Sequence, residues 1–368
     1  MTRILCVMGT RPEVIKMAPV VQALQAEGLE APVLATAQHR GMLDQMLATF
    51  DLAPTWDLDL MRPGQSLAEL TGRMVPALDR VFREAGAQAV LAQGDTTTVF
   101  CAALAAYYSG LPFGHVEAGL RSGDLQAPFP EEGMRRLSAV LARWHFAPTE
   151  GAAAALRREG VDASAIHCVG NTVIDALLGM AHRTDLPPLP LPEVSPDQRL
   201  ILVTLHRREN FGEPLQRILG ALKVFAEAHP QAVLLYPVHP NPQVEGPAHA
   251  ILGGLPNVHL LAPLDYPVLV RALRECRWVL TDSGGLQEEA PALGKPVLVF
   301  RDVTERPEAL AAGGALLVGS DPQRFRGLAE ELWQEGPRYA AMAQPRFPYG
   351  DGKASTRIAA CLKVSLAP

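Results

Sequence analysis

Residues 278–308 constrain the fold of this 368-residue chain more than any other stretch. They begin with a short apolar run ending at Leu280 and break at Asp282 and two consecutive glycines. They then continue as a segment compatible with a helix and lead through the apolar run PVLVF into a polar loop. A buried strand, a tight glycine turn, a helix and another strand form the repeating unit of parallel α/β sheets. We therefore predict an α/β fold.

The turn in this stretch, Ser283-Gly284-Gly285, is a candidate anion site. Glycines let backbone N–H groups approach an anion without a Cβ in the way, and the start of a helix adds unpaired donors and the positive end of its dipole. A carboxylate further into the helix, such as Glu289, can accept the hydroxyl groups of a ribose. Ser283 alone could be no more than a helix cap, but the basic loop that contains Arg306 favours a nucleotide site.

The length of the chain favours two domains, because a single core seldom grows this large. Alternation of predicted strands and helices occurs on both sides of the proline-rich segment DLPPLPLPEVSPDQ. We predict an N-terminal Rossmann-like domain at 1–180 and 350–368, a stiff linker at 181–198, and a C-terminal Rossmann-like domain at 199–349. The last helix is assigned to the first domain because the turn FPYGDG precedes it.

Composition excludes several classes of protein. The chain is 48% hydrophobic and 20% charged, contains no run of eighteen apolar residues and begins without a signal-peptide pattern, so we expect a cytoplasmic protein with no membrane insertion. A net charge of −6 gives no electrostatic reason to expect nucleic acid as a partner. The five cysteines are odd in number and far apart, which predicts buried apolar side chains and neither disulfides nor a metal site.

Carboxylates gather at the predicted ends of strands in the first half. Asp95 follows the run AVLAQG, and Glu117 follows the next strand, where His115 also lies. Because parallel strands end at the same edge of a sheet, these groups should lie close together. Glu131 opens a later helix that carries Arg135, which taken alone is also ordinary capping chemistry.

Basic residues and histidines accompany these acids. Arg11 and Lys16 lie at the start of the first helix, where the dipole disfavours cations, so they are either solvated charges or ligands of an anion. His206 ends the first strand of the second half, and His239 ends the next. A strand end is where ligands of α/β sheets bind.

With these pieces assembled, the chain resembles the non-hydrolysing UDP-N-acetylglucosamine 2-epimerases. The resemblance is carried by the ordered blocks GTRPEVIKMAPV, QHRGMLDQML, QGDTTTVFCAAL, HVEAGLRSGD, FPEE, VGNTVIDAL, HRRENFGEPL, HPNP, DSGGLQEEAPALGKPVLVFRDVTERPEA and GDGKAS. It implies a GT-B-type fold, with two Rossmann-like doubly wound domains facing a deep cleft and a C-terminal helix that crosses back to the first domain. It also implies a homodimer that interconverts UDP-N-acetylglucosamine and UDP-N-acetylmannosamine without metal or other cofactor, as a precursor supply for cell-surface polysaccharide.

The resemblance also assigns residues to roles. It implies catalytic roles for Asp95, Glu117, Glu131 and His206. It implies contacts to the sugar and UDP from Arg11, Lys16, Arg135, Leu264, Leu269, Ser283, Gly284, Gly285, Glu289 and Arg306, and a candidate allosteric site at Gln45, Arg207 and His239. The chain departs from the family pattern at Leu269, where an aromatic residue often packs on the uracil, and at Gly41, where a longer polar residue is common. These departures predict apolar contact in place of stacking and weaken the case for allostery.

Elimination and re-addition of UDP suit these residue types. Removal of the C2 proton as UDP departs from C1 yields a 2-acetamidoglucal, and the return of UDP with a proton on the opposite face inverts C2. The route needs carboxylate or imidazole groups near C2 and cations at the diphosphate. Which of Asp95, Glu117 and Glu131 takes the proton is left open by the sequence.

Three other functions remain compatible with parts of this pattern. A GT-B-fold UDP-sugar glycosyltransferase would need an acceptor sugar. A hydrolysing epimerase would release free N-acetylmannosamine and UDP. A non-catalytic UDP-sugar sensor would need Ser283, Gly285 and Glu289 but would leave the three carboxylates of the first half without a role.

Overall fold

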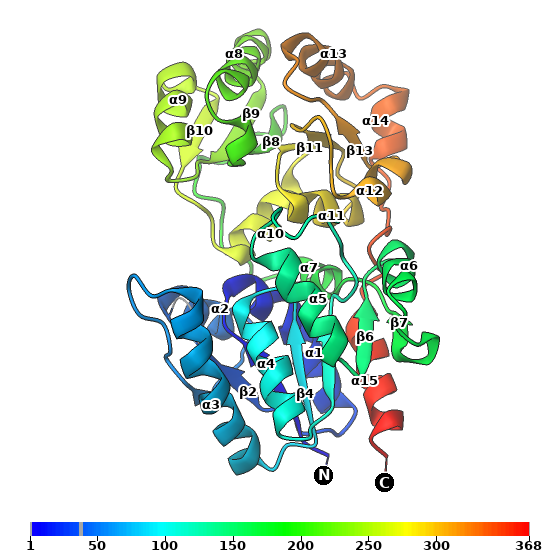
Figure 1. The fold of residues 1–368 in the computed structure, drawn as a ribbon. Helices are drawn as coiled ribbons and strands as arrows, with labels where there is room; N and C mark the ends of the chain where they lie inside the picture. Colours follow the sequence, from blue (N-terminus) through cyan, green and yellow to red (C-terminus); the bar gives the residue numbers. More distant parts are fainter. Residues whose placement is uncertain (1, 37–39, 368) are drawn as a thin grey trace. The chain divides into compact units, whose positions relative to one another are not determined.

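The computed structural model describes residues 2–36 and 40–367, and these form two compact units, one of residues 2–36, 40–176 and 349–367 and the other of residues 177–348. Each unit is built on one parallel sheet (Figure 1). Together the two sheets confirm the predicted fold class of two Rossmann-like α/β domains.

The first unit contains a seven-stranded sheet with the order β3-β2-β1-β4-β5-β6-β7. Its strands are β1 (Ile4–Met8), β2 (Val33–Ala35), β3 (Pro54–Asp57), β4 (Ala89–Gln93), β5 (Phe113–Val116), β6 (Trp144–Ala147) and β7 (Ile166–Cys168). Its helices are α1 (Arg11–Ala26), α2 (Arg40–Thr49), α3 (Leu67–Ala85), α4 (Thr97–Tyr108), α5 (Glu131–Leu141), α6 (Glu150–Arg158), the 3-10 turn η1 (Ala163–Ala165) and α15 (Ala354–Ser365). Helix α7 (Thr172–Ala181) carries the chain out of this unit.

The second unit contains a six-stranded sheet with the order β10-β9-β8-β11-β12-β13. Its strands are β8 (Arg199–Thr204), β9 (Ala232–Pro237), β10 (Val258–Leu261), β11 (Trp278–Thr281), β12 (Val297–Val299) and β13 (Ala315–Leu317). Its helices are the 3-10 turn η2 (Arg208–Asn210), α8 (Glu213–Ala228), α9 (Pro242–Leu252), α10 (Tyr266–Glu275), α11 (Gly284–Ala292), α12 (Pro307–Ala311), α13 (Pro322–Trp333) and α14 (Pro337–Met342).

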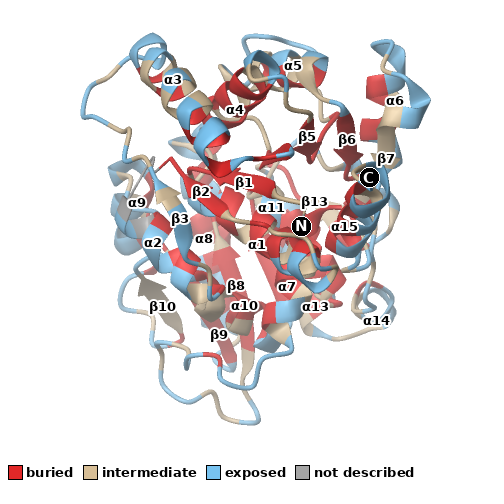
Figure 2. Ribbon diagram, turned by 90° about the horizontal axis from the view of Figure 1, so that it is seen from below, coloured by how far each residue is buried: buried red, intermediate tan, exposed pale blue. Residues whose placement is uncertain are grey.

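Burial follows the pattern of sheets that helices cover on both faces. All five residues of β1 are fully buried, and so are most residues of the central strands β8 and β11 of the second sheet, as is typical of parallel strands. Figure 2 shows buried residues concentrated in strands such as β1 and β8, whereas helices such as α3 alternate buried and exposed residues. The strand order reverses direction between β1 and β4 and between β8 and β11, and such switch points are where doubly wound sheets bind ligands.

Two connecting segments complete the architecture. Helix α15, red in Figure 1, packs against α1, so the C-terminal helix returns to the first unit as predicted. The proline-rich segment lies along α10, where Arg271 Nη1 donates to the carbonyl oxygens of Leu186 at 3.1 Å and Pro187 at 3.2 Å. Within the described part of the chain, no helix combines the length and the apolar character needed to cross a membrane.

Candidate active site

Glu117 is the centre of a polar cluster at the carboxyl edge of the first sheet. It follows β5 directly and is only 8% exposed. Lys16 Nζ lies 2.7 Å from both of its carboxylate oxygens, Asn171 Nδ2 donates to Oε1 at 3.0 Å, and Gln93 Nε2 donates to Oε2. Its φ of 64° is rare for a residue with a side chain, and backbone strain of this kind is concentrated at functional sites. The structure thus brings together the predicted residues Glu117 and Lys16.

Asp95 and Arg135 form a second pair at this edge, with Arg135 Nη2 2.7 Å from Asp95 Oδ2. Glu132, which is fully buried, holds Arg135 from the other side at 3.1 Å and Arg136 at 3.0 Å. Burial acts to raise the pKa of Glu132, but the Ser122 N–H and the two guanidinium groups outweigh it and lower the pKa. Sequence reasoning gave Glu132 no role, although its i,i+3 and i,i+4 spacing to the two arginines was a usable signal.

Glu131 opens α5 and differs from these paired acids. The residue is partly buried, and its Oε2 atom has no hydrogen-bond partner among the described residues. Buried polar atoms are rarely left without a partner unless a ligand, a water or a chemical role explains them. The carboxylate therefore has acceptor capacity that the described protein groups do not use.

A side-chain carboxylate of the protein itself occupies the first turn of α1. The buried carboxylate of Glu13 accepts hydrogen bonds from the N–H groups of Gly9 at 2.5 Å and Thr10 at 2.9 Å and from the Thr96 hydroxyl at 2.6 Å. These are the donors with which a Rossmann turn would usually hold a phosphate. The β1–α1 turn is thus occupied by Glu13, while Arg11 beside it is exposed and forms no ion pair with any residue that the structure describes.

His115 does not contribute an exposed base to this edge. The side chain is fully buried, and burial lowers its pKa to about 4, so the ring is neutral near pH 7. Its Nε2 lies 2.7 Å from the carbonyl oxygen of Gly94, to which the neutral ring donates. His115 therefore supports the turn before Asp95.

In the second unit, Asp282 fixes the position of His206. Asp282 has no exposed surface and accepts hydrogen bonds from the backbone N–H groups of His206 and Arg207 and from Asn210 Nδ2. His206 Nδ1 lies 3.2 Å from Asp282 Oδ1, which leaves Nε2 for other contacts. The His206 ring stacks on that of His239, with centroids 5.9 Å apart. Burial acts to raise the pKa of Asp282, but the interactions with His206 and the backbone outweigh it and lower the pKa.

The start of α11 is flanked by two guanidinium groups. Ser283 precedes the helix without capping it through its side chain, so the hydroxyl is not used for that purpose. A Cβ on Gly284 would lie 3.7 Å from Arg207 Nη2 and 3.9 Å from Arg306 Nη2. Arg207 Nε is buried with no hydrogen-bond partner among the described residues. A helix N-terminus between two arginines is a site for a phosphate or diphosphate.

Glu289 lies one turn into α11, close to this anion site. A Cβ on Gly285 would lie 3.7 Å from Glu289 Oε2, and the buried Tyr266 hydroxyl donates to Glu289 Oε1 at 3.2 Å. Burial and the Glu289 charge raise the pKa of Tyr266 well above its usual value, so the phenol stays a donor. Leu264 and Leu269, both partly exposed, lie just before and within α10, the helix that Tyr266 begins. Sequence reasoning missed Tyr266, because no local pattern connects it with Glu289.

The remaining candidates have less structural support. Gln45 is exposed on α2 in the first unit, whereas Arg207 and His239 belong to the second.

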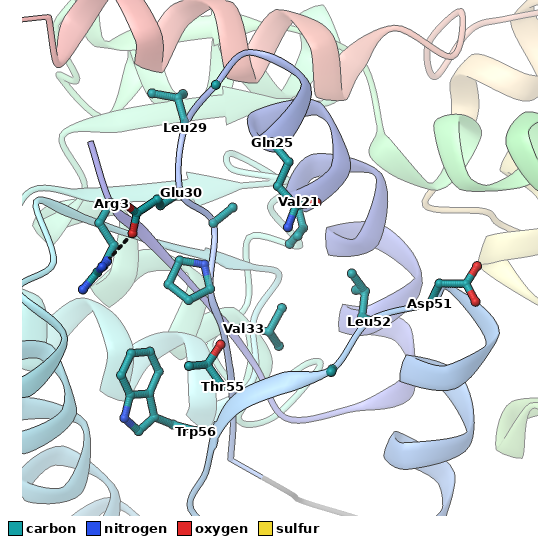
Figure 3. A pocket seen from close by; sticks show the side chains of 14 residues that line it. Arg3, Val21, Gln25, Leu29, Glu30, Val33, Asp51, Leu52, Thr55 and Trp56 are labelled. Carbon is teal, nitrogen blue, oxygen red and sulfur yellow. Dashed lines mark hydrogen bonds and ion pairs between the residues drawn. The ribbon is translucent and has the colours of Figure 1, made fainter. Parts of the chain in front are cut away.

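No group of three histidine, cysteine or acidic side chains within residues 2–36 and 40–367 is arranged to hold a metal ion. A cavity of about 710 Å³ lies beside Arg3, Val21 and Trp56, near the amino ends of β1 and β2 (Figure 3). None of the predicted site residues lines this cavity.

Comparison with known proteins identifies the family that this chain resembles. The family model described as UDP-N-acetylglucosamine 2-epimerase matches residues 22–363. The UDP-N-acetylglucosamine 2-epimerase of Escherichia coli K12 is 48% identical over 98% of both chains. The crystal structure of UDP-GlcNAc 2-epimerase from Neisseria meningitidis bound to UDP-GlcNAc has 43% identity and a TM-score of 0.89, covering 98% of this chain and 99% of that one. MurG of Acinetobacter baumannii, with 16% identity, a TM-score of 0.62 and coverage of 99% and 100%, supports the fold alone.

Proposed function

The chain belongs to the family of UDP-N-acetylglucosamine 2-epimerases, and we propose from this premise that it interconverts UDP-N-acetylglucosamine and UDP-N-acetylmannosamine by anti elimination and re-addition of UDP. The observation that supports catalysis most is that the first unit holds three carboxylates in three different settings. Glu117 is paired with Lys16 and Asp95 with Arg135, while Glu131 keeps an oxygen that no described donor uses. A UDP-sugar sensor would not need this arrangement.

Roles follow from these contacts. We propose that Glu131 takes the C2 proton, because its unused acceptor can bind one without breaking an ion pair, and that Glu117 is the acid–base group for the opposite face of the sugar. Lys16 and Arg135 supply positive charge where the departing diphosphate gains negative charge. His206, oriented by Asp282, is proposed to act on the same sugar or diphosphate.

The second unit is proposed to hold the nucleotide. The α11 N-terminus and the guanidinium groups of Arg207 and Arg306 suit a diphosphate, and Glu289 suits the ribose hydroxyls. In the predicted division of labour, the acids come from the N-terminal domain and the nucleotide contacts from the C-terminal domain.

We also propose a cytoplasmic homodimer that feeds cell-surface polysaccharide synthesis. Support for a partner comes from exposed apolar side chains on the packed helices α4 and α5, namely Tyr107, Tyr108, Leu137 and Val140. Exposed apolar residues that gather on one surface often mark protein contacts. Sedimentation of the purified protein, whose chain mass is 39.6 kDa, would measure the oligomeric state.

The reaction itself is tested by an NMR time course with UDP-N-acetylglucosamine as the sole substrate, in D2O with EDTA. Elimination and re-addition should place deuterium at C2 of the product and move an 18O label from the bridging position into non-bridging β-phosphate oxygens. Inverted product that keeps protium at C2 would contradict the elimination route. A need for an acceptor sugar would indicate a glycosyltransferase, release of free N-acetylmannosamine a hydrolysing epimerase, and no conversion a sensor.

The UDP site is tested by Glu289→Gln. The amide keeps an oxygen for Tyr266 but loses the charge offered to the ribose hydroxyls, so UDP affinity should fall by about 1.5–3 kcal/mol in calorimetry. The matched control is Glu331→Gln, a half-exposed glutamate of α13 in the same unit, which should bind UDP normally. Equal UDP affinity in both variants would remove Glu289 from the site.

A further inference from the structure

The two points where the chain passes between units are joined by a direct backbone contact. The chain leaves the first unit after Ala176 and re-enters it at Tyr349. The backbone N–H of Asn171 donates to the carbonyl oxygen of Tyr349 with an N···O distance of 2.5 Å. A Cβ on Gly350 would lie 3.1 Å from the Cα of Gly170, and Gly350 has a φ of 129° that residues with side chains rarely adopt. The two segments therefore cross in a contact that only glycine allows.

The side chain at this crossing reaches the catalytic cluster. Asn171 is 2% exposed, and its Nδ2 donates to Glu117 Oε1 at 3.0 Å. Its Oδ1 accepts from the Val173 N–H at the start of α7 at 3.2 Å. Because that N–H can only donate, the amide oxygen must face α7 and the NH₂ group must face Glu117. The orientation of Asn171 is thus decided by the first turn of the helix that leaves the unit.

Glu117 needs such support because its backbone is in the left-handed region. Strained residues persist only where surrounding contacts determine their position. Lys16 of α1 and Gln93 of β4 hold the carboxylate, and Asn171 holds it from the crossing. Any movement of residues 177–348 as a body must be accommodated by the chain near Ala176 and Tyr349, next to this hydrogen bond.

We propose that Asn171 is a positioning residue that makes the placement of the Glu117 carboxylate depend on the Tyr349–Gly350 crossing. This inference rests on the proposed function, since it assigns Glu117 to the reaction. The hydrogen bond from Asn171 connects Glu117 with the crossing, a connection that the ion pairs Lys16–Glu117 and Asp95–Arg135 do not make. Changes at the crossing should therefore reach the chemical step without changing how the second unit binds UDP.

The test uses Asn171→Asp and Gly350→Ala in the full-length protein. Asn171→Asp keeps an acceptor for Val173 but loses the donor to Glu117, so kcat should fall about 10- to 100-fold while UDP affinity is unchanged. The new carboxylate beside Glu117 should also move the acid limb of the kcat–pH profile upward, because neighbouring carboxylates resist joint ionisation. Gly350→Ala should lower kcat, as Asn171→Asp does.

The control for backbone strain is Gly160→Ala. Gly160 has a φ of 85° in the same unit, but an added Cβ there meets no atom within 4 Å, so kcat should remain at the wild-type value. Equal kcat in Gly350→Ala and Gly160→Ala, or a loss in kcat that merely follows the melting temperature, would overturn the proposal.

A readout independent of turnover separates this proposal from the proposed function. In protein labelled with 13C at the glutamate carboxyl carbon, the Glu117 signal is identified by its absence in Glu117→Gln. Gly350→Ala should shift that signal and Gly160→Ala should not. A shift in a protein that fails to epimerise would uphold the link and refute the function, whereas an unmoved signal in an active enzyme would refute the link alone.

Discussion

Replacing Glu117 with glutamine should reduce kcat by about 10²–10⁴-fold, because acid–base groups contribute rate enhancements of this size. The carboxylate binds Lys16 Nζ through both oxygens at 2.7 Å. A neutral amide offers only one acceptor and leaves the largely buried ammonium group without its counter-charge. Both the acid and the cation beside it would be disturbed at once.

The matched control for this variant is Glu159→Gln. Glu159 forms an ion pair with Arg121 at 2.7 Å in the same unit, but Glu159 is more exposed than Glu117 and is not part of the Glu117 cluster. It should keep nearly normal turnover. Steady-state kinetics and UDP calorimetry on both variants test the role of Glu117. If Glu117→Gln retains most of the wild-type kcat, Glu117 has no part in the chemical step.

Asp282→Ala should cost the folded protein about 3–5 kcal/mol, the usual range when one partner of a buried polar pair is removed. Asp282 has no exposed surface, and its loss takes the acceptor away from the backbone N–H groups of His206 and Arg207 and leaves Asn210 Nδ2 with the carbonyl oxygen of Phe300 alone. The same change frees the His206 ring, so turnover should fall as well.

The pH dependence of this effect has a definite sign. The folded state lowers the pKa of Asp282, so its stabilisation is complete above the unfolded value of about 3.9 and is lost as pH falls through the folded value. In urea unfolding, the difference in the free energy of unfolding between the wild type and Asp282→Ala should therefore become smaller below about pH 4. The exposed Asp197→Ala, which removes a contact to Ser195, should change stability little at any pH. A small difference in the free energy of unfolding at pH 7 would contradict the proposal that Asp282 stabilises the fold and positions His206.

Local patterns in the sequence were sufficient for the fold class. Runs such as AVLAQ and WVLT form the buried strands β4 and β11 because near-continuous apolar segments can only be buried between two layers of helices. Ser283 and its glycines predicted a helix start, and α11 begins at Gly284. The positions of Asp95 and Glu117 at one sheet edge also follow locally, since each comes directly after a parallel strand.

The partners of these residues were decided only by the tertiary structure. Lys16 and Glu117 are separated by 101 residues, and Asp282 and His206 by 76, so no periodicity connects them. Asn171 and Tyr266 act through contacts that arise when separate strands and helices pack. The sequence by itself determined which elements form and which side chains end them, because burial and backbone preferences act over a few residues. The pairing of charges was settled by the packing of distant elements, because a buried carboxylate is stable only where the whole fold brings donors to it.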